Sequence, residues 1–343
     1  MRIVGVDRRF LVGAIVWIAA LALCPVIVGS VYLGVAILVL LAIPGGIALN
    51  LLQGIAGQVS VGNAAFLGVG GYAAATFTVE LHTPFLVSLI LGTLAAGVVG
   101  AIVAIPALRV RGLYLLLATL ALQFIASYVF SVYQTAANQP AGFALPNPSL
   151  GGYQIVSDNQ WYWVLAIAAS VLLYAMVTIK RSWIGRSWMA IREDEKLAAA
   201  AGINVPASIV VCFTVTSAMI GLQGVLYAYR VGLVNSDSYT LTLAIAYVTI
   251  VLVGGEGSTA GPIVGAIVVE GLPYVLNKVI PATSTLAAHS ADLQQAAYGL
   301  LIVLVLIAEP EGLAGVGRRL GRRAGAVTRA AMNSARRRRA GVA

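Results

Sequence analysis

The sequence predicts an all-α membrane protein, a polytopic bundle of transmembrane helices. Of its 343 residues, 60% are hydrophobic and 10% are charged, and the mean hydropathy is +0.95. Soluble domains carry roughly 25% charged residues, so an ordinary soluble fold is excluded. Apolar stretches recur at about 20 residues, the length of helix that crosses a bilayer. The 37 glycines suit the close helix packing that lipid requires.

The apolar runs divide into about ten predicted spans, within a range of roughly 8 to 10. They are residues 10–29, 31–52, 59–80, 84–106, 112–133, 161–180, 207–230, 240–254, 260–278 and 294–309. Because the 240–254 run is short, we expect residues 240–278 to form either two short tilted helices or a re-entrant hairpin. The predicted organisation is a short segment 1–9, a membrane domain 10–309 and a basic tail 310–343.

The distribution of lysine and arginine predicts the orientation of the chain. These residues mark cytoplasmic loops, which places both termini, Arg109, Arg111 and residues 180–204 on the cytoplasmic side. Residues 134–160 contain no basic residue and are predicted to face outside. The nine arginines of residues 318–339 account for the whole net charge of +9. We expect them to contact anionic lipid rather than nucleic acid, because no aromatic residues interleave with them.

Residues 180–204 form the one long charged segment within the membrane domain. Ser187 to Ala201 is predicted as a single helix, with Gly202 as its stop and Pro206 barring its continuation. The helix is either a solvated loop helix or one that docks in a groove of a cytoplasmic partner. A docking segment at 181–206 would present Arg186, Met189, Arg192, Glu193, Asp194, Glu195, Leu197, Ala200 and Gly202.

Several polar side chains lie inside or at the mouth of predicted spans. Such residues line a transport pathway or form hydrogen bonds between helices, and both interpretations stay open. For Thr119 packing is favoured, and Glu270 could equally pair with Lys278. The candidates for a substrate pathway are Gln58, Ser60, Asn63, Thr119, Gln123 and Glu270.

Glycines 257, 261 and 265 recur every four residues and predict a small-residue face for helix packing. The loop around them lacks the Gly-Lys-Ser/Thr sequence that holds ATP. No metal-ligand cluster or nucleophile motif occurs in the sequence, so we expect no enzymatic activity and no cofactor in this chain. Buried acids are also too few for proton-coupled transport. A stand-alone channel or secondary transporter, or a purely structural subunit, remain the rival classes.

Five stretches together resemble the permease subunits of branched-chain amino acid (LivM/LivH-type) ABC importers. They occur in the order that the family shows, cover roughly residues 45 to 315, and favour the LivM type by order and length. The stretches are GQVSVGNAAFLGVGGYAAA, LRVRGLYLLLATLALQF, GRSWMAIREDEKLAAAAGINVPASIVVCFTVTSAMIGLQGVLYA, VLVGGEGSTAGPIVGA and YGLLIVLVLIAEPEGLAG.

The resemblance implies a type II-like importer in the bacterial plasma membrane. Its implied partners are two cytoplasmic ATPase subunits, which hold ATP and Mg²⁺, an extracytoplasmic binding protein, and a second permease chain, favoured to be a paralogue. Residues Arg186 to Asn204 would be the coupling helix that docks on the ATPase. Asn63 stands where the family commonly has histidine, and residues 138–148 lack its threonine–glycine-rich run. The expected cargo is therefore a branched-chain amino acid or a related small polar solute, with urea, short amides, and aromatic or other organic acids as alternatives.

Overall fold

The computed structural model describes residues 8–27, 29–110 and 112–279, together with 296, 299–305, 307 and 312–315. The chain is mainly helical there, as predicted. The predicted span 294–309 is described only in part, and most of the basic tail lies outside the described residues. The helices are α1 (Arg8–Ile27), α2 (Ser30–Leu49), the π-helix η1 (Asn50–Ile55), α3 (Asn63–Val79), α4 (Phe85–Ala107), α5 (Leu113–Ala136), α6 (Asp158–Arg181), α7 (Trp183–Glu193), α8 (Glu195–Ala200), α9 (Val205–Val231), the 3₁₀ helix η2 (Ser236–Ser238), α10 (Leu241–Gly254) and α11 (Gly261–Val279).

Six helices within the described residues are long and apolar enough to cross a membrane. They are Tyr32–Ile55, Phe85–Ala107, Leu113–Ala136, Asp158–Arg181, Val205–Val231 and Ser236–Gly254. Two shorter apolar helices cover Val12–Pro25 and Gly261–Tyr274. The predicted class, a helical membrane bundle, is confirmed at this level, whereas the count of about ten spans stays a prediction.

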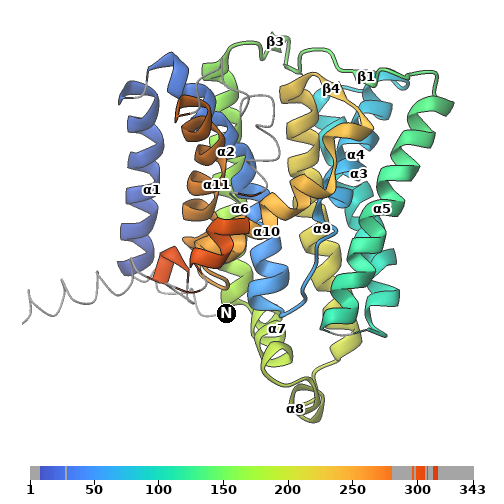
Figure 1. Cartoon of the computed structure of the whole chain (residues 1–343), viewed down its shortest axis with the longest axis vertical. Helices are drawn as coiled ribbons and strands as arrows, with labels where there is room; N and C mark the ends of the chain where they lie inside the picture. Colours follow the sequence, from blue (N-terminus) through green and yellow to red (C-terminus); the bar gives the residue numbers. More distant parts are fainter. Residues whose placement is uncertain are drawn as a thin grey trace, which may run out of the picture.

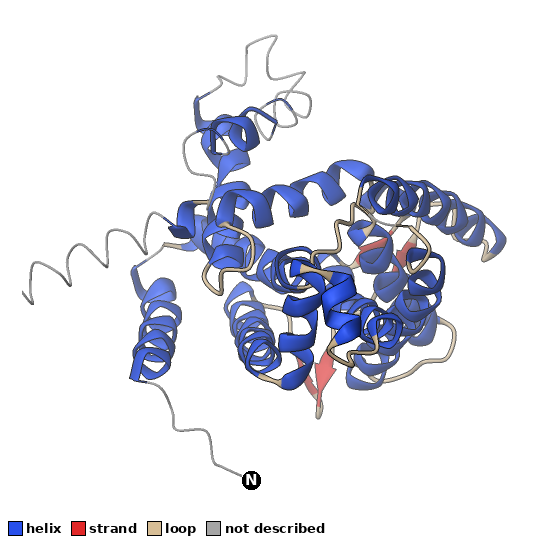
Figure 2. Ribbon diagram, turned by 90° about the horizontal axis from the view of Figure 1, so that it is seen from below, coloured by secondary structure: helices blue, strands red, loops and turns tan. Residues whose placement is uncertain are grey.

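Helices α3, α4 and α9 pack most closely, with α2, α6, α10 and α11 beside them (Figure 1). Small residues bring their backbones together, since a Cβ on Gly224 of α9 would lie only 2.0 Å from the carbonyl oxygen of Leu67 in α3. Lipid provides no hydrophobic driving force between helices, so such close packing holds them together. Helix α1 stands at the edge of the bundle (Figure 2) and contacts α6 through a 2.9 Å hydrogen bond from Trp17 Nε1 to Ser170 Oγ.

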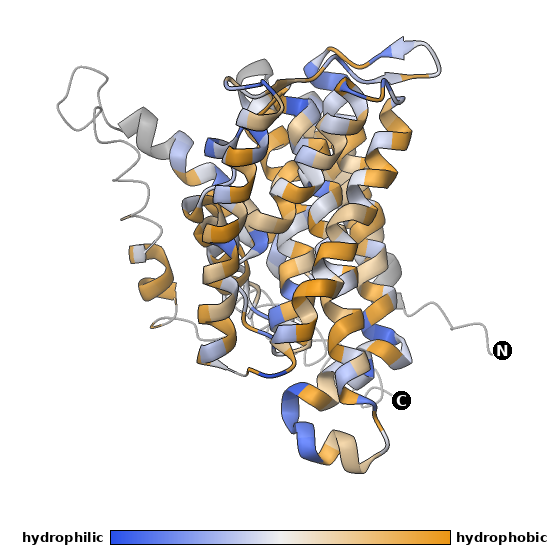
Figure 3. Ribbon diagram, turned by 90° about the vertical axis from the view of Figure 1, so that its right-hand side faces the viewer, coloured by the Kyte–Doolittle hydropathy of each residue, from blue (hydrophilic) through white to orange (hydrophobic). Residues whose placement is uncertain are grey.

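Two short antiparallel sheets cover one end of the bundle. They are formed by β1 (Phe143–Ala144), β2 (Ser149–Leu150), β3 (Tyr153–Gln154) and β4 (Leu233–Val234), with β1 paired to β4 and β2 to β3. Helices α7 and α8 project from the opposite end (Figure 1), and hydrophobic residues cover the helices in between (Figure 3). The predicted outer segment 134–160 and the charged segment 180–204 thus lie at opposite ends. The strands themselves were not predicted, because two-residue strands leave no periodicity in the sequence.

Replacing Gly224 by alanine should destabilise the bundle, because the added methyl group collides with the α3 backbone. Overpacking of this kind costs about 1–3 kcal/mol. Gly97→Ala is the matched control: a Cβ there would meet the Ala218 side chain at 3.2 Å, and alanine favours the helix. Thermal unfolding of the purified protein in detergent should show a lower midpoint for Gly224→Ala than for Gly97→Ala. Equal midpoints would contradict the assigned α3–α9 contact.

Candidate functional site

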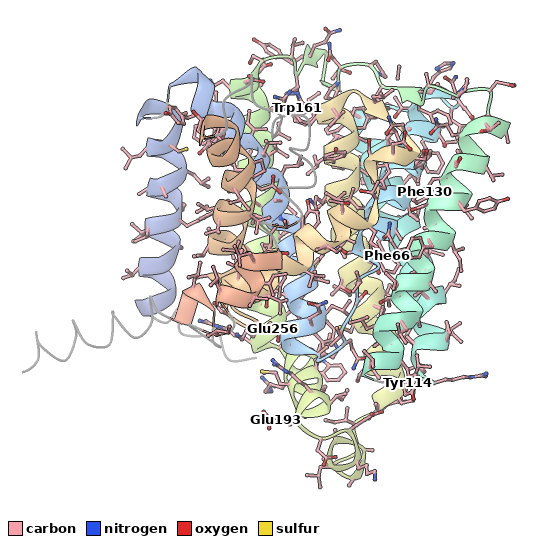
Figure 4. All side chains as sticks on the ribbon, viewed as in Figure 1. Phe66, Tyr114, Phe130, Trp161, Glu193 and Glu256 are labelled. Atoms are coloured by element: carbon pink, nitrogen blue, oxygen red, sulfur yellow. The ribbon has the colours of Figure 1, made fainter. Side chains whose placement is uncertain are left out.

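The chain between η1 and α3 is not helical. Residues 56–62 form an extended connection that leads into the bundle, and Phe66 in the first turn of α3 lies near mid-height (Figures 1 and 4). Non-helical backbone at membrane depth requires partners within the protein. The side chain of Gln53 donates to the Ser60 carbonyl at 2.7 Å, and the Val61 amide donates to Thr119 Oγ1 at 3.1 Å. Side chains of the protein therefore satisfy the backbone groups of this non-helical connection.

A second break precedes α10. Residues 235–240 return from β4 into the bundle, and α10 begins only at Leu241. Gln123 joins the two breaks: its Oε1 accepts from the Ala65 amide in the first turn of α3, and its Nε2 donates to the Tyr239 carbonyl before α10, both at 2.8 Å. Gln123 is fully buried near the middle of α5. The amino-terminal ends of α3 and α10 therefore lie close together near the middle of the bundle.

Four of the six predicted pathway residues lie together at this meeting point. Ser60, Asn63, Thr119 and Gln123 are all nearly fully buried. Ser60, Thr119 and Gln123 hydrogen-bond to the backbone of residues 61–65, so they support the broken chain. Asn63 differs, because its buried Oδ1 has no hydrogen-bond partner.

The other two predicted pathway residues have different surroundings. Gln58 is half-buried, and its amide donates locally to the Ala56 carbonyl at 3.3 Å. Glu270 lies half-buried on α11, the helix that packs against α2 and α10. The side chain of Lys278, its predicted partner, lies outside the described residues.

Aromatic side chains form a packed layer between this polar cluster and the strands. Tyr72 of α3 stacks on Phe130 of α5 with ring centroids 4.7 Å apart, and Tyr239 packs beside both rings. The Tyr72 hydroxyl donates to Gln134 Oε1 at 2.8 Å. Gln134 and Tyr239 were not predicted as site residues. Only the fold shows that these side chains, far apart in the sequence, form one layer.

The charged segment forms two helices rather than the single predicted one. Asp194 interrupts it with an extended backbone (φ −157°, ψ 115°), and its Oδ1 accepts from the amides of Lys196 and Leu197 at 2.8 and 3.0 Å. Asp194 therefore caps α8, which is the position that aspartate prefers over a helix interior. Gly202 ends α8 with φ +85°, as predicted, and Pro206 lies in the first turn of α9.

Most of the residues predicted to dock on a partner are exposed. Glu195 is half-exposed, Met189 packs partly against the core, and the exposed members are Arg186, Arg192, Glu193, Asp194, Leu197, Ala200 and Gly202. Arg192 has a further contact that was not predicted, because its guanidinium turns back and donates to the Gly54 carbonyl of η1. The break at Asp194 also places Arg192 and Lys196 on two different helices, α7 and α8. Docking itself stays a prediction.

The predicted glycine face is correct for two of its three members. Gly261 and Gly265 lie on α11 against the end of α10, where a Cβ on Gly265 would lie 1.9 Å from the Ile250 carbonyl oxygen. Gly257 lies in the turn between the two helices with φ +69°, so it belongs to no helix face. The expectation of two short helices meeting in this region agrees with α10 and α11.

Comparison with known proteins identifies the family. The family model described as "Branched-chain amino acid transport system / permease component" matches residues 27–307. The branched-chain amino acid permease protein LivM of Escherichia coli is 26% identical over 331 residues, covering 90% of this chain and 75% of LivM. Its counterpart from Salmonella typhimurium is 25% identical, covering 78% of this chain and 66% of that protein.

Another relative also carries a transport name. The ribose import permease RbsC of Haemophilus influenzae is 27% identical, covering 74% of this chain and 76% of RbsC. No solved structure matches the chain. The resemblance inferred from the five sequence stretches is confirmed: this chain belongs to the permease-component family of branched-chain amino acid transport systems, whose members are membrane-spanning transport subunits and not enzymes.

Proposed function

We propose that this chain forms the translocation pathway of an ATP-driven importer for branched-chain amino acids or a related small polar solute. The family match over most of the chain carries the proposal. In this arrangement both termini and α7–α8 face the cytoplasm, and the strands face outside, in a bacterial plasma membrane. ATP and Mg²⁺ bind two partner ATPase subunits, an extracytoplasmic binding protein delivers the solute, and a second permease chain, a paralogue, completes the pathway.

The coupling segment, α7 and α8 (Trp183–Ala200), is the proposed docking site for an ATPase. It projects from the bundle (Figure 1), and two large apolar side chains on it, Trp183 and Leu197, are 68% and 69% exposed. Apolar anchors with a polar rim are typical of a helix that enters a groove on a partner. Arg186, Glu193 and Glu195 supply the charged rim, and reversal of both glutamate charges should weaken docking.

The polar cluster at the two breaks is the proposed solute path. Asn63 supplies a buried acceptor with no partner in the protein, and the amino-terminal ends of α3 and α10 provide partial positive charge beside it. The aromatic layer closes the cluster toward the strands, and η1 with residues 56–62 closes it toward the coupling segment. ATP-driven movement of the coupling segment would open these two sides in alternation. Few contacts with the solute are required, because the binding protein selects it.

The cargo is proposed from the relatives. A branched-chain amino acid permease matches 90% of the chain, and a ribose import permease among the relatives supports keeping other small polar solutes as alternatives. Urea, short amides and aromatic or other organic acids are the alternatives. Ligand identification on the binding protein that copurifies with this chain decides among them.

Import should require the whole assembly. We expect the chain, purified with its ATPase and permease partners and reconstituted in liposomes, to take up radiolabelled leucine only with ATP and loaded binding protein. The physical reason is that this chain has no ATP-binding loop and few buried acids for ion coupling. Uptake by the chain alone, without ATPase subunits, would favour a channel or secondary transporter.

Asn63→Leu should reduce import about tenfold or more while the complex still assembles, because a buried acceptor that contacts solute is lost. Ser217→Ala is the matched control. Ser217 also has an unpartnered buried oxygen, but it packs against Gly100 between α4 and α9, away from the breaks. Transport assays in the same liposomes measure both variants. Equal import by both variants would assign Asn63 a packing role only.

A further inference from the structure

Two helices end side by side at the foot of the bundle. The π-helix η1 ends at Ile55 and α10 ends at Gly254. Asn50 joins these ends from a fully buried position: its Nδ2 donates to the Ser258 carbonyl at 2.8 Å, and its Oδ1 accepts from the Gly257 amide at 2.7 Å. The η1 helix and residues 255–260 therefore form one hydrogen-bonded unit, the turn unit.

Carbonyl oxygens of the turn unit accept hydrogen bonds from cationic side chains of the neighbouring helices. The last carbonyls of a helix lack partners within it and carry partial negative charge, which attracts lysine and arginine. Arg192 at the end of α7 donates to such a carbonyl, that of Gly54 in η1. Lys180 at the end of α6 donates to the carbonyl of Gly257 in the turn after α10. A second nitrogen of Arg192 lies 3.8 Å from a carboxylate oxygen of Glu256.

Arg192 therefore contacts both halves of the turn unit with one side chain. Its planar guanidinium donates in several directions at once, which a lysine ammonium on a flexible stem does less well. Its aliphatic stem lies against Gly57, where a Cβ would be 2.7 Å from Arg192 Cγ, and Gly57 adopts φ +70°. A side chain at position 57 would displace the arginine, so the glycine leaves room for this contact. Figure 4 shows Glu256 at the foot of the bundle, above Glu193.

The turn unit is continuous with both breaks of the pathway. It leads through residues 56–62 to the start of α3, and through α10 back to Tyr239, and Gln123 joins those two points. We propose that Arg192 is the positioning residue through which the coupling segment moves both broken spans together. The inference rests on the proposed function, since it requires an ATPase that moves α7 and α8.

Arg192→Gln in the complete complex tests this role. We expect the ATPase subunits to copurify and to hydrolyse ATP, while solute imported per ATP falls about tenfold, because the charge-assisted hydrogen bond to Gly54 and the ion pair with Glu256 are both lost. Arg192→Lys and Glu256→Gln each keep part of the contact, so their losses should be smaller. These two variants also keep the test valid if the glutamine variant folds poorly.

Two controls distinguish a loss of movement transmitted through Arg192 from two other effects. These are loss of ATPase docking and loss of a positive charge alone. Leu197→Glu should lose the copurifying ATPase, and Arg109→Gln, which removes an exposed arginine elsewhere on the same side, should couple normally. The inference is overturned if Arg192→Gln imports with the wild-type stoichiometry, or if it loses the ATPase as Leu197→Glu does. Failure of the wild-type complex to import with ATP would overturn the proposed function, and this inference with it.

Discussion

A backbone amide inside a bilayer must find its hydrogen-bond partner within the protein, because lipid offers none, and this permease interrupts two of its spans at mid-depth. Its polar residues are arranged around that requirement. Gln123 serves both interruptions at once, and Thr119 and Gln53 bind the extended connection before α3. The breaks are stable because these side chains replace the missing helical hydrogen bonds. A broken span also provides a polar surface in an otherwise apolar bundle, which is what passage of a polar solute requires.

The same requirement explains the cations at the foot of the bundle. Carbonyls at the end of η1 and in the turn after α10 need donors, and these donors are Arg192 of the coupling segment and Lys180 at the end of the preceding helix α6. A contact that stabilises the fold thereby joins the surface proposed for the ATPase to the surface proposed for the solute. At the other end, the aromatic rings of Tyr72, Phe130 and Tyr239 pack against one another between the polar cluster and the strands. The side chains that support the breaks are thus the ones proposed to serve transport.

Hydropathy and motif order were sufficient to predict the fold class, the family and the position of the charged segment. Individual contacts were harder to predict. Asn50 and Gln53 are polar residues within an apolar run, the same signal that pointed to Asn63, but their partners lie far away in the sequence. Asp194 looked like one of several charges on a continuous helix, and only backbone geometry shows that it caps a new one. Arg192 is exposed, but its contact with the Gly54 carbonyl could not be predicted, since charge patterning does not reveal which way a long side chain turns.

The coupling segment and the turn unit should move as one body. Spin labels at Arg186 on α7, at exposed Ala260 in the turn unit and at exposed Tyr153 in the strand hairpin, in a background where Cys24 and Cys212 are replaced, allow a direct measurement. Electron spin resonance distances should be compared with and without bound ATP in the assembled complex. We expect the distance from 186 to 260 to stay constant while the distance from 260 to 153 changes. A change in the first distance with the second fixed would contradict this expectation.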